Sequence, residues 1–411
     1  MSRTLVRIYT SEKWQTSLTA IFFNSKIANP SIRDRATEYL ARLKAFYDDI
    51  QSLGNKGNCW GCSSRNAKFY ITRTELPLAG SNKAINFFPL WDKGVAICGN
   101  CIWFVQFAPL VFYQCVNFAL LQSNSQKIMQ AWTRISLKDV IAQLSIGDFT
   151  GINNLGYKNP VNFLFHIVMQ IINLSTDELQ NETPFIRLVL FSNYGQSPSL
   201  KFLDFPSRIF TFLRDVKISG FFNDWQKFVF SRTNRYLKDN SRTEEDLLKD
   251  RKNPIYERLI AMKSIHGYFI NKKKRSINVP WDVFRLYLEE VLKINPERIQ
   301  YIKELGDKIV EIMKQTNNKK RLYALERAKS YDELRMALLF LAKDSMKIKD
   351  APIFQIEELS KNLFPDTEYG VPWKESRDFL LFRIYESGFD FLKQFIQEEL
   401  EQEELEEEEE I

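Results

Sequence analysis

The sequence predicts an α+β protein, in which a mixed N-terminal domain carries a four-cysteine zinc module and a C-terminal antiparallel helical bundle follows. Two Cys-x-x-Cys pairs lie in a half that mixes short strand-like and helix-like patterns. From about residue 254 onward, apolar residues recur at helical spacing. Because 411 residues are too many for one small core, we expect two parts, residues 1–253 and 254–411.

The N-terminal part is predicted to contain four kinds of segment. Arg33–Gln51 has the apolar spacing of an amphipathic helix. The zinc module spans about residues 55–105 and has room for two short strands, Lys68–Thr74 and Ala84–Pro89. Phe185–Phe191 is apolar except for one arginine and predicts a mostly buried strand. The polar residues 239–254 are typical of a linker or an exposed crossing segment.

The C-terminal part is predicted to be helical. Asn295 followed by Pro296 is a strong helix start, and Ser330 with Glu333 forms a capping box pattern before a second helix. A third helix is expected from about Lys374. The inward-facing residues expected in the first and third helices are Ile299, Ile302, Leu305, Ile309, Ile312, Phe379, Phe382, Ile384, Phe389, Leu392 and Ile396.

The cysteine spacing is the strongest chemical signal in the chain. Cys59-x-x-Cys62 and Cys98-x-x-Cys101 each supply two thiolates from one tight turn, and four such ligands suit tetrahedral Zn²⁺. The gap between the pairs exceeds that of compact zinc fingers, so a hairpin is expected between them. We therefore expect a closed structural zinc site, with Cys115 outside it as a small buried hydrophobe. The alternative is two redox or core cysteine pairs.

The charge distribution favours a polyanionic partner. Residues 398–410 hold ten glutamates and no basic residue; without them, 41 acidic residues stand against 57 basic ones, a net charge of +16. Such a basic body favours nucleic acid over a merely soluble basic protein. The sequence shows neither a signal-peptide hydrophobic region nor an apolar run long enough for a membrane span, which with the cysteine pairs predicts a cytoplasmic protein.

The chemistry of an enzyme is not evident in the sequence. His166 and His266 are the two histidines, and neither belongs to a local His-Asp or His-x-x-x-His motif. There is also no phosphate-binding loop, dinucleotide fingerprint or nucleophile elbow. We therefore expect a protein that is not an enzyme.

Four segments are candidates for nucleic-acid contact. One of them, Phe202–Lys238, intersperses aromatic and basic residues that could stack on unpaired bases, with a buried core as the alternative. Basic residues of the zinc module could hold phosphates, and a Gly-Asn-Lys loop at 151–160 could approach a minor groove. A basic run at 272–275 could follow a phosphate backbone. Scattered surface charge, an ordinary turn and a solvated loop are the respective alternatives. The candidate residues are Arg65, Lys68, Arg73, Asn153, Asn154, Lys158, Asn159, Lys272, Lys273, Lys274 and Arg275.

The combination of features resembles a known family. The Cys59/Cys62 and Cys98/Cys101 knuckles, a basic middle and the helical region from about 254 are similar to the large subunit of a type I-B CRISPR Cascade, the Cst-type branch of the Cas-eight proteins. The resemblance implies a non-catalytic subunit that recognises the protospacer-adjacent motif and helps to open the DNA strands. It implies CRISPR RNA, target duplex DNA, a Cas-five-type protein, backbone proteins and small subunits as partners. It also implies docking of a helicase-nuclease or a transposition adaptor.

Two rival functions remain. A zinc-stabilised nuclease would need acidic residues or a histidine positioned for metal-ion chemistry. A free-standing zinc-ribbon regulator would bind its DNA site without guide RNA. Co-purification with CRISPR RNA separates the three hypotheses.

Overall fold

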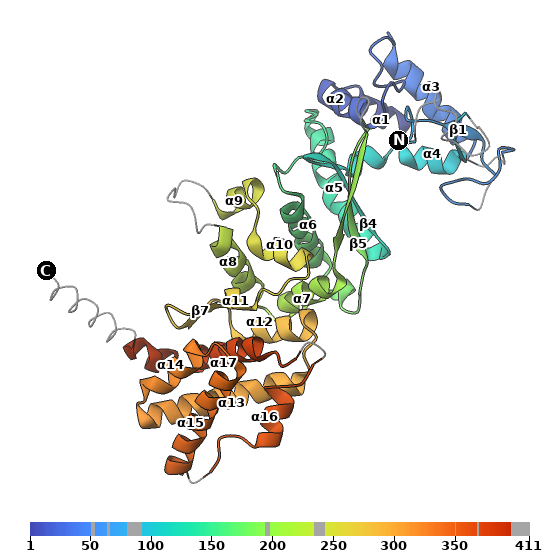
Figure 1. Cartoon of the computed structure of the whole chain (residues 1–411). Coiled ribbons are helices and arrows are strands. Elements are labelled where there is room, and N and C mark those ends of the chain that lie inside the picture. The colour runs from blue at the N-terminus through green and yellow to red at the C-terminus, as the bar shows by residue number, and fades with distance from the viewer. Residues whose placement is uncertain are drawn as a thin grey trace. The chain divides into compact units, whose positions relative to one another are not determined.

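The computed structural model in Figure 1 contains two compact units. It describes residues 1–50, 54–63, 66–79, 93–193, 198–233, 243–349, 351–367 and 370–395. The first unit comprises Met1–Ser207 and Asp239–Lys252, and the second comprises Arg208–Lys238 and Asn253–Ile411. The contacts thus group 208–238 with the second unit, whereas the sequence predicts a single division after residue 253. The predicted acidic tail, 398–410, and the predicted strand 84–89 lie outside the described residues.

The first unit begins with helices packed around the cysteine module. The elements are α1 (Ser2–Tyr9), α2 (Glu12–Ile21), α3 (Arg35–Asp48), β1 (Phe69–Ile71), β2 (Val95–Ile97) and α4 (Gly99–Val105). Helix α3 starts where the Asp34 side chain accepts the Thr37 N–H at 3.0 Å. Leu43 and Phe46 are buried, whereas Tyr47 is 59% exposed and its ring centroid lies 5.4 Å from that of Trp103.

A four-stranded antiparallel sheet forms the rest of this unit. Its order is β3 (Tyr113–Cys115), β4 (Asn117–Ser123), β5 (Ile186–Ser192) and β6 (Ser199–Phe205). Helices α5 (Gln126–Ile146) and α6 (Pro160–Ser175) lie along one face of it (Figure 1). The strand predicted at 185–191 is confirmed as β5. Ala119 pairs with Leu190, and Leu121 pairs with Leu188, so buried residues of both strands share one face.

The second unit is mostly helical. Its elements are α7 (Ser207–Ile218), α8 (Phe222–Thr233), α10 (Pro254–Ile260), α11 (His266–Phe269), β7 (Ile270–Asn271), β8 (Ser276–Ile277), α12 (Trp281–Leu286), α13 (Pro296–Thr316), α14 (Lys319–Arg327), α15 (Tyr331–Lys349), α16 (Ile356–Asn362) and α17 (Trp373–Ser387). A further short helix, α9 (Glu244–Asp250), belongs to the first unit. The predicted α+β fold class, with a helical C-terminal region, is confirmed.

The predicted helix starts in the second unit are confirmed. Asn295 caps α13 by accepting the Glu297 N–H at 2.8 Å, and Ser330 accepts the Glu333 N–H at 3.1 Å. The expected apolar stripe of α13 is buried throughout. Phe389, however, is 46% exposed, because α17 ends at Ser387 and the turn at Gly388 shifts the apolar register.

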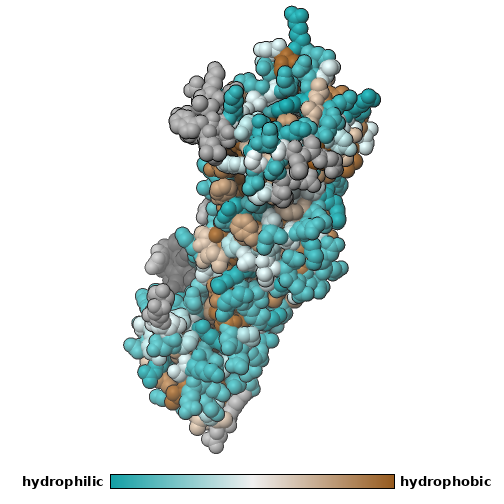
Figure 2. Space-filling model, turned by 90° about the vertical axis from the view of Figure 1, so that its right-hand side faces the viewer, coloured by the Kyte–Doolittle hydropathy of each residue, from teal (hydrophilic) through white to brown (hydrophobic). Residues whose placement is uncertain are grey.

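Polar residues dominate the visible surface. Figure 2 shows hydrophilic side chains over most of the face turned to the viewer, with hydrophobic residues in scattered groups, as is usual on folded proteins. Within the described ranges, every helix is too short or too polar to cross a membrane.

Candidate metal centre and nucleic-acid interface

The first cysteine knuckle is a tight turn fixed by backbone hydrogen bonds. The Cys59 carbonyl accepts the Ser63 N–H at 2.8 Å, and Trp60 donates its N–H to the Ala96 carbonyl at 3.0 Å. The turn therefore docks on the strand that leads to the second knuckle. Gly61 is required here: a Cβ at this position would lie 2.9 Å from the Cys101 sulfur.

The second knuckle joins a strand to a helix. Strand β2 pairs with β1, Phe69 opposite Ile97, and Cys98 follows directly as the N-cap of α4. Cys101 lies in the first turn of that helix. Strand pairing thus places Cys98, and helix formation then brings Cys101 to the same side.

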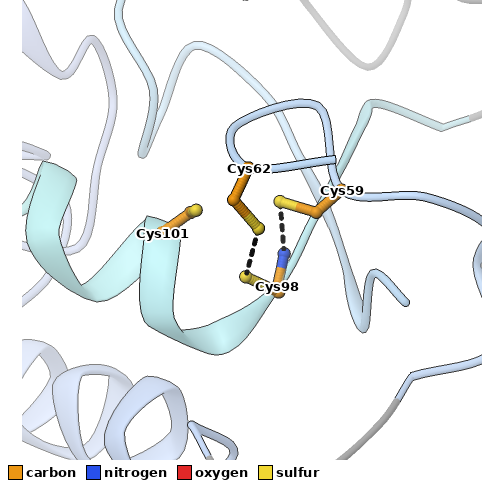
Figure 3. A group of neighbouring side chains, drawn as sticks. All are labelled: Cys59, Cys62, Cys98 and Cys101. Atoms are coloured by element: carbon orange, nitrogen blue, oxygen red, sulfur yellow. Dashed lines mark hydrogen bonds between the residues drawn. The ribbon is translucent and has the colours of Figure 1, made fainter. Parts of the chain in front are cut away.

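The two knuckles bring all four sulfurs together (Figure 3). The Sγ atoms lie within 4.8 Å of one another, and Cys62 and Cys98 are 3.8 Å apart. A metal–sulfur distance of about 2.3 Å places tetrahedral ligands about 3.8 Å apart, so this spacing suits a metal ion. It is too long for a disulfide, whose sulfurs are about 2.05 Å apart. Two N–H groups, from Gly61 and Cys98, also donate to the Cys59 sulfur at 3.3 Å each.

The electrostatics of the cluster call for a cation. Burial raises the pKa of the Cys98 and Cys101 thiols above the ordinary value, because thiolates lose solvation there. Four close thiolates would also repel one another. A divalent cation removes both penalties, since metal binding deprotonates its thiol ligands. The residues present therefore fit a bound metal ion.

The cluster is a closed, all-thiolate set. It is the one group of three or more cysteine, histidine or acidic ligands that the described residues bring together. Cys115 lies apart in β3, buried, and burial raises its pKa to about 12. The predicted ligands Cys59, Cys62, Cys98 and Cys101 do converge, and the geometry defines a four-cysteine metal-binding module of structural type.

The comparison with protein families points the same way. Residues 52–113 match a family model described as CRISPR-associated protein (Cas_CXXC_CXXC). This segment includes all four cysteines and covers less than half of the chain. No curated protein and no solved structure matches the chain significantly. The match indicates a CRISPR-associated protein family and supports a CRISPR-related role with components of a CRISPR complex as partners.

Two of the three basic residues predicted in the cysteine module have intramolecular partners. Lys68 forms an ion pair with Asp49. The Arg73 guanidinium lies over the Phe23 ring, 4.6 Å from its centroid. Arg65 lies outside the described residues. The nucleic-acid contacts of these three residues stay predictions.

The glycine- and asparagine-containing loop at 151–160 divides into two buried and two exposed candidates. Asn153 is buried and donates its side-chain amide to the Ser136 carbonyl at 2.9 Å. Asn159 is buried as the N-cap of α6, accepting the Val161 N–H at 2.8 Å. Asn154 is exposed and accepts the Gly156 N–H at 2.8 Å. Lys158 is 74% exposed and pairs with Asp250 at 2.7 Å.

Mutations at the buried and exposed positions of the 151–160 loop can distinguish a role in stability from a role in DNA contact. Asn159→Ala should lower the free energy of unfolding by about 1 kcal/mol, because α6 loses its cap. Asn154→Ala with Lys158→Ala should leave stability nearly unchanged, since an exposed ion pair contributes little. If the loop contacts a groove, the double variant alone should weaken binding to duplex DNA while the melting temperature holds. Equal loss of duplex and single-strand binding would contradict a groove contact.

The predicted basic run forms the turn of a hairpin in the second unit. Lys272, Lys273 and Lys274 are exposed between β7 and β8. Arg275 is buried instead, with its Nε 3.0 Å from a Glu326 carboxylate oxygen. The run therefore offers Lys273 and Lys274 to a ligand, whereas Lys272 pairs with Asp378 and Arg275 joins the hairpin to α14.

A polar network around His266 and Asp378 could not be predicted from local sequence motifs. The His266 imidazole lies 2.5 Å from the Ser264 hydroxyl through Nδ1 and 3.5 Å from the Asp378 carboxylate through Nε2. The Asp378 carboxylate also pairs with Lys272 at 2.9 Å and Arg377 at 3.0 Å. These contacts tie the hairpin region to α17. No sequence signal indicates them, because the partners are far apart in the chain.

Proposed function

We propose that this chain is the non-catalytic large subunit of a CRISPR RNA-guided DNA surveillance complex of the type I-B Cascade kind, working in the cytoplasm. The observation that carries the proposal is the overlap of two findings: the segment matching a CRISPR-associated family contains the four converging cysteines. The metal is proposed to be Zn²⁺, because four thiolates at tetrahedral spacing select it over oxygen-seeking cations.

The metal centre supports a structural role. Its four thiols leave no position for a water or substrate, so the ion would hold the two knuckles together without activating a nucleophile. With a net charge of +16 outside residues 398–410, the chain suits a partner rich in phosphate. The subunit would read the protospacer-adjacent motif in the duplex, assist strand opening and dock the helicase-nuclease or transposition adaptor. Guide pairing would read the rest of the target.

The proposal is tested by purifying the tagged chain after expression with its neighbouring genes. We expect stoichiometric CRISPR RNA and companion subunits, and duplex binding that requires the adjacent motif and weakens steeply with salt. If the chain alone cleaves DNA in the presence of a divalent cation, the proposal is wrong and the protein is a zinc-stabilised nuclease. Tight binding to a fixed duplex site without RNA would replace it with the regulator.

A further inference from the structure

Trp373 lies where two surface grooves of the second unit meet. One groove, of about 990 Å³, runs between the start of α13, the end of α16 and the start of α17. The other, of about 760 Å³, lies between the α14–α15 connection and the first turns of α17. Trp373 and Lys374 line both grooves, so this pair joins them into one path.

Trp373 lies at the start of α17 and has two cations over its ring. Its backbone N–H donates to the Val371 carbonyl at 2.8 Å at the start of α17. The Lys374 ammonium lies 5.5 Å, and the Arg377 guanidinium carbon 5.6 Å, from ring centroids of the indole. Arg377 is fixed in turn, because its Nη1 donates to the Ala328 carbonyl at 2.6 Å. The indole ring and its two cations thus form one aromatic and cationic surface.

The second groove adds exposed positive charge. Arg327, Lys329 and Lys374 are exposed along its lining. Its two acidic residues already have partners: Glu326 accepts from Arg275 and Tyr385, and Glu333 accepts the Lys329 backbone N–H at 2.7 Å. The lining of this groove thus carries four cations, Arg327, Lys329, Lys374 and Arg377, against two carboxylates.

We propose that this path binds single-stranded nucleic acid, with one unpaired base stacked on Trp373 and the flanking phosphates at Lys374, Lys329 and Arg327. An aromatic platform with cations along a groove matches the alternation of base and phosphate in a single strand. A duplex keeps its bases paired and offers no free ring face. The assignment of the strand as guide RNA or opened DNA rests on the proposed function, whereas strand binding by the isolated chain does not.

The test is equilibrium binding of a fluorescein-labelled oligothymidine and of a duplex of equal length to the full chain. Trp373→Ala should weaken oligothymidine binding about tenfold, the loss of one stacked base, and Trp373→Phe should restore most of it. Lys374→Ala and Lys329→Ala should each lower the slope of log affinity against log salt by about 0.7. Lys308→Ala, an exposed lysine of α13 that lines neither groove, should change nothing.

Three outcomes would overturn the site. The first is an oligothymidine affinity that Trp373→Ala does not change. The second is an equal effect of Lys308→Ala and Lys374→Ala. The third is competition by polyglutamate as effective as by unlabelled oligothymidine, which would indicate an acidic peptide as the ligand. Far-ultraviolet circular dichroism and melting temperature identify a variant that fails to fold, and Trp373→Phe then carries the test. Oligothymidine binding without CRISPR RNA in the purified complex would remove the proposed function and leave this site standing.

Discussion

Replacing Cys98 by serine is expected to destabilise the cysteine module by on the order of 4 kcal/mol, as large an effect as single substitutions usually have. Cys98 is buried, follows β2 and caps α4, and its N–H donates to the Cys59 sulfur. Losing one thiolate weakens metal binding, and in structural sites the free energy of metal binding is also free energy of folding. Limited proteolysis should therefore cut within about residues 54–105 in Cys98→Ser and spare the wild type.

Cys115→Ala is the matched control for this change. Cys115 is also a buried cysteine, but it lies in β3, outside the cluster. Its replacement removes only a small apolar side chain, so we expect a modest loss of stability and no new cleavage in the cysteine module. Identical proteolysis patterns for the two variants would contradict a structural metal centre.

Asp378→Asn is expected to destabilise the second unit, by less than Cys98→Ser destabilises the cysteine module. The Asp378 carboxylate contacts Lys272, Arg377 and His266 at once. Its replacement by an amide leaves these groups without the anion that they share. We expect the free energy of unfolding to fall by about 2 kcal/mol, less than for a fully buried pair because Lys272 remains partly solvated. Asp282→Asn is the control, since Asp282 is half exposed and 3.7 Å from Arg285. Chemical denaturation of both variants measures the difference.

The same network predicts how acid affects the second unit. Burial alone would raise the pKa of Asp378, but hydrogen bonds from His266 and Lys272 outweigh it and hold the pKa below its ordinary value. A depressed carboxyl pKa contributes stability above the unfolded value, about 3.9, and that contribution is lost as pH falls toward the folded pKa. The stability gap between wild type and Asp378→Asn should therefore persist between about pH 5 and about pH 7 and shrink below about pH 4. A gap that does not change on acidification would contradict this role.

The sequence predicts the metal cluster and the helix starts because those signals are local. Cys-x-x-Cys spacing fixes two ligands within one turn, and Asn295 before Pro296 specifies a cap whatever packs nearby. The asparagines of the 151–160 loop show the limit of this reasoning. The amide of Asn159 is equally suited to a helix cap or a groove edge, and only burial in the folded chain distinguishes the two.

Features that depend on distant residues could not be predicted in the same way. His266 carries no local motif, yet folding places Asp378 beside it. In the sequence, Trp373 is an ordinary aromatic residue at a helix start. The grooves beside it form only because α13, α14 and α16 pack near it in the fold. The inward position expected for Phe389 is wrong, because α17 ends at Ser387 and the turn at Gly388 interrupts the apolar repeat.

Metal analysis of freshly purified, reduced protein tests most directly whether the four cysteines hold zinc, as we propose. Inductively coupled plasma mass spectrometry should find one zinc per chain in the wild type and in Cys115→Ala. Zinc should be lost from a variant in which Cys59, Cys62, Cys98 and Cys101 are all serine. Wild-type protein without zinc, or a quadruple variant that keeps it, would contradict the proposed zinc centre.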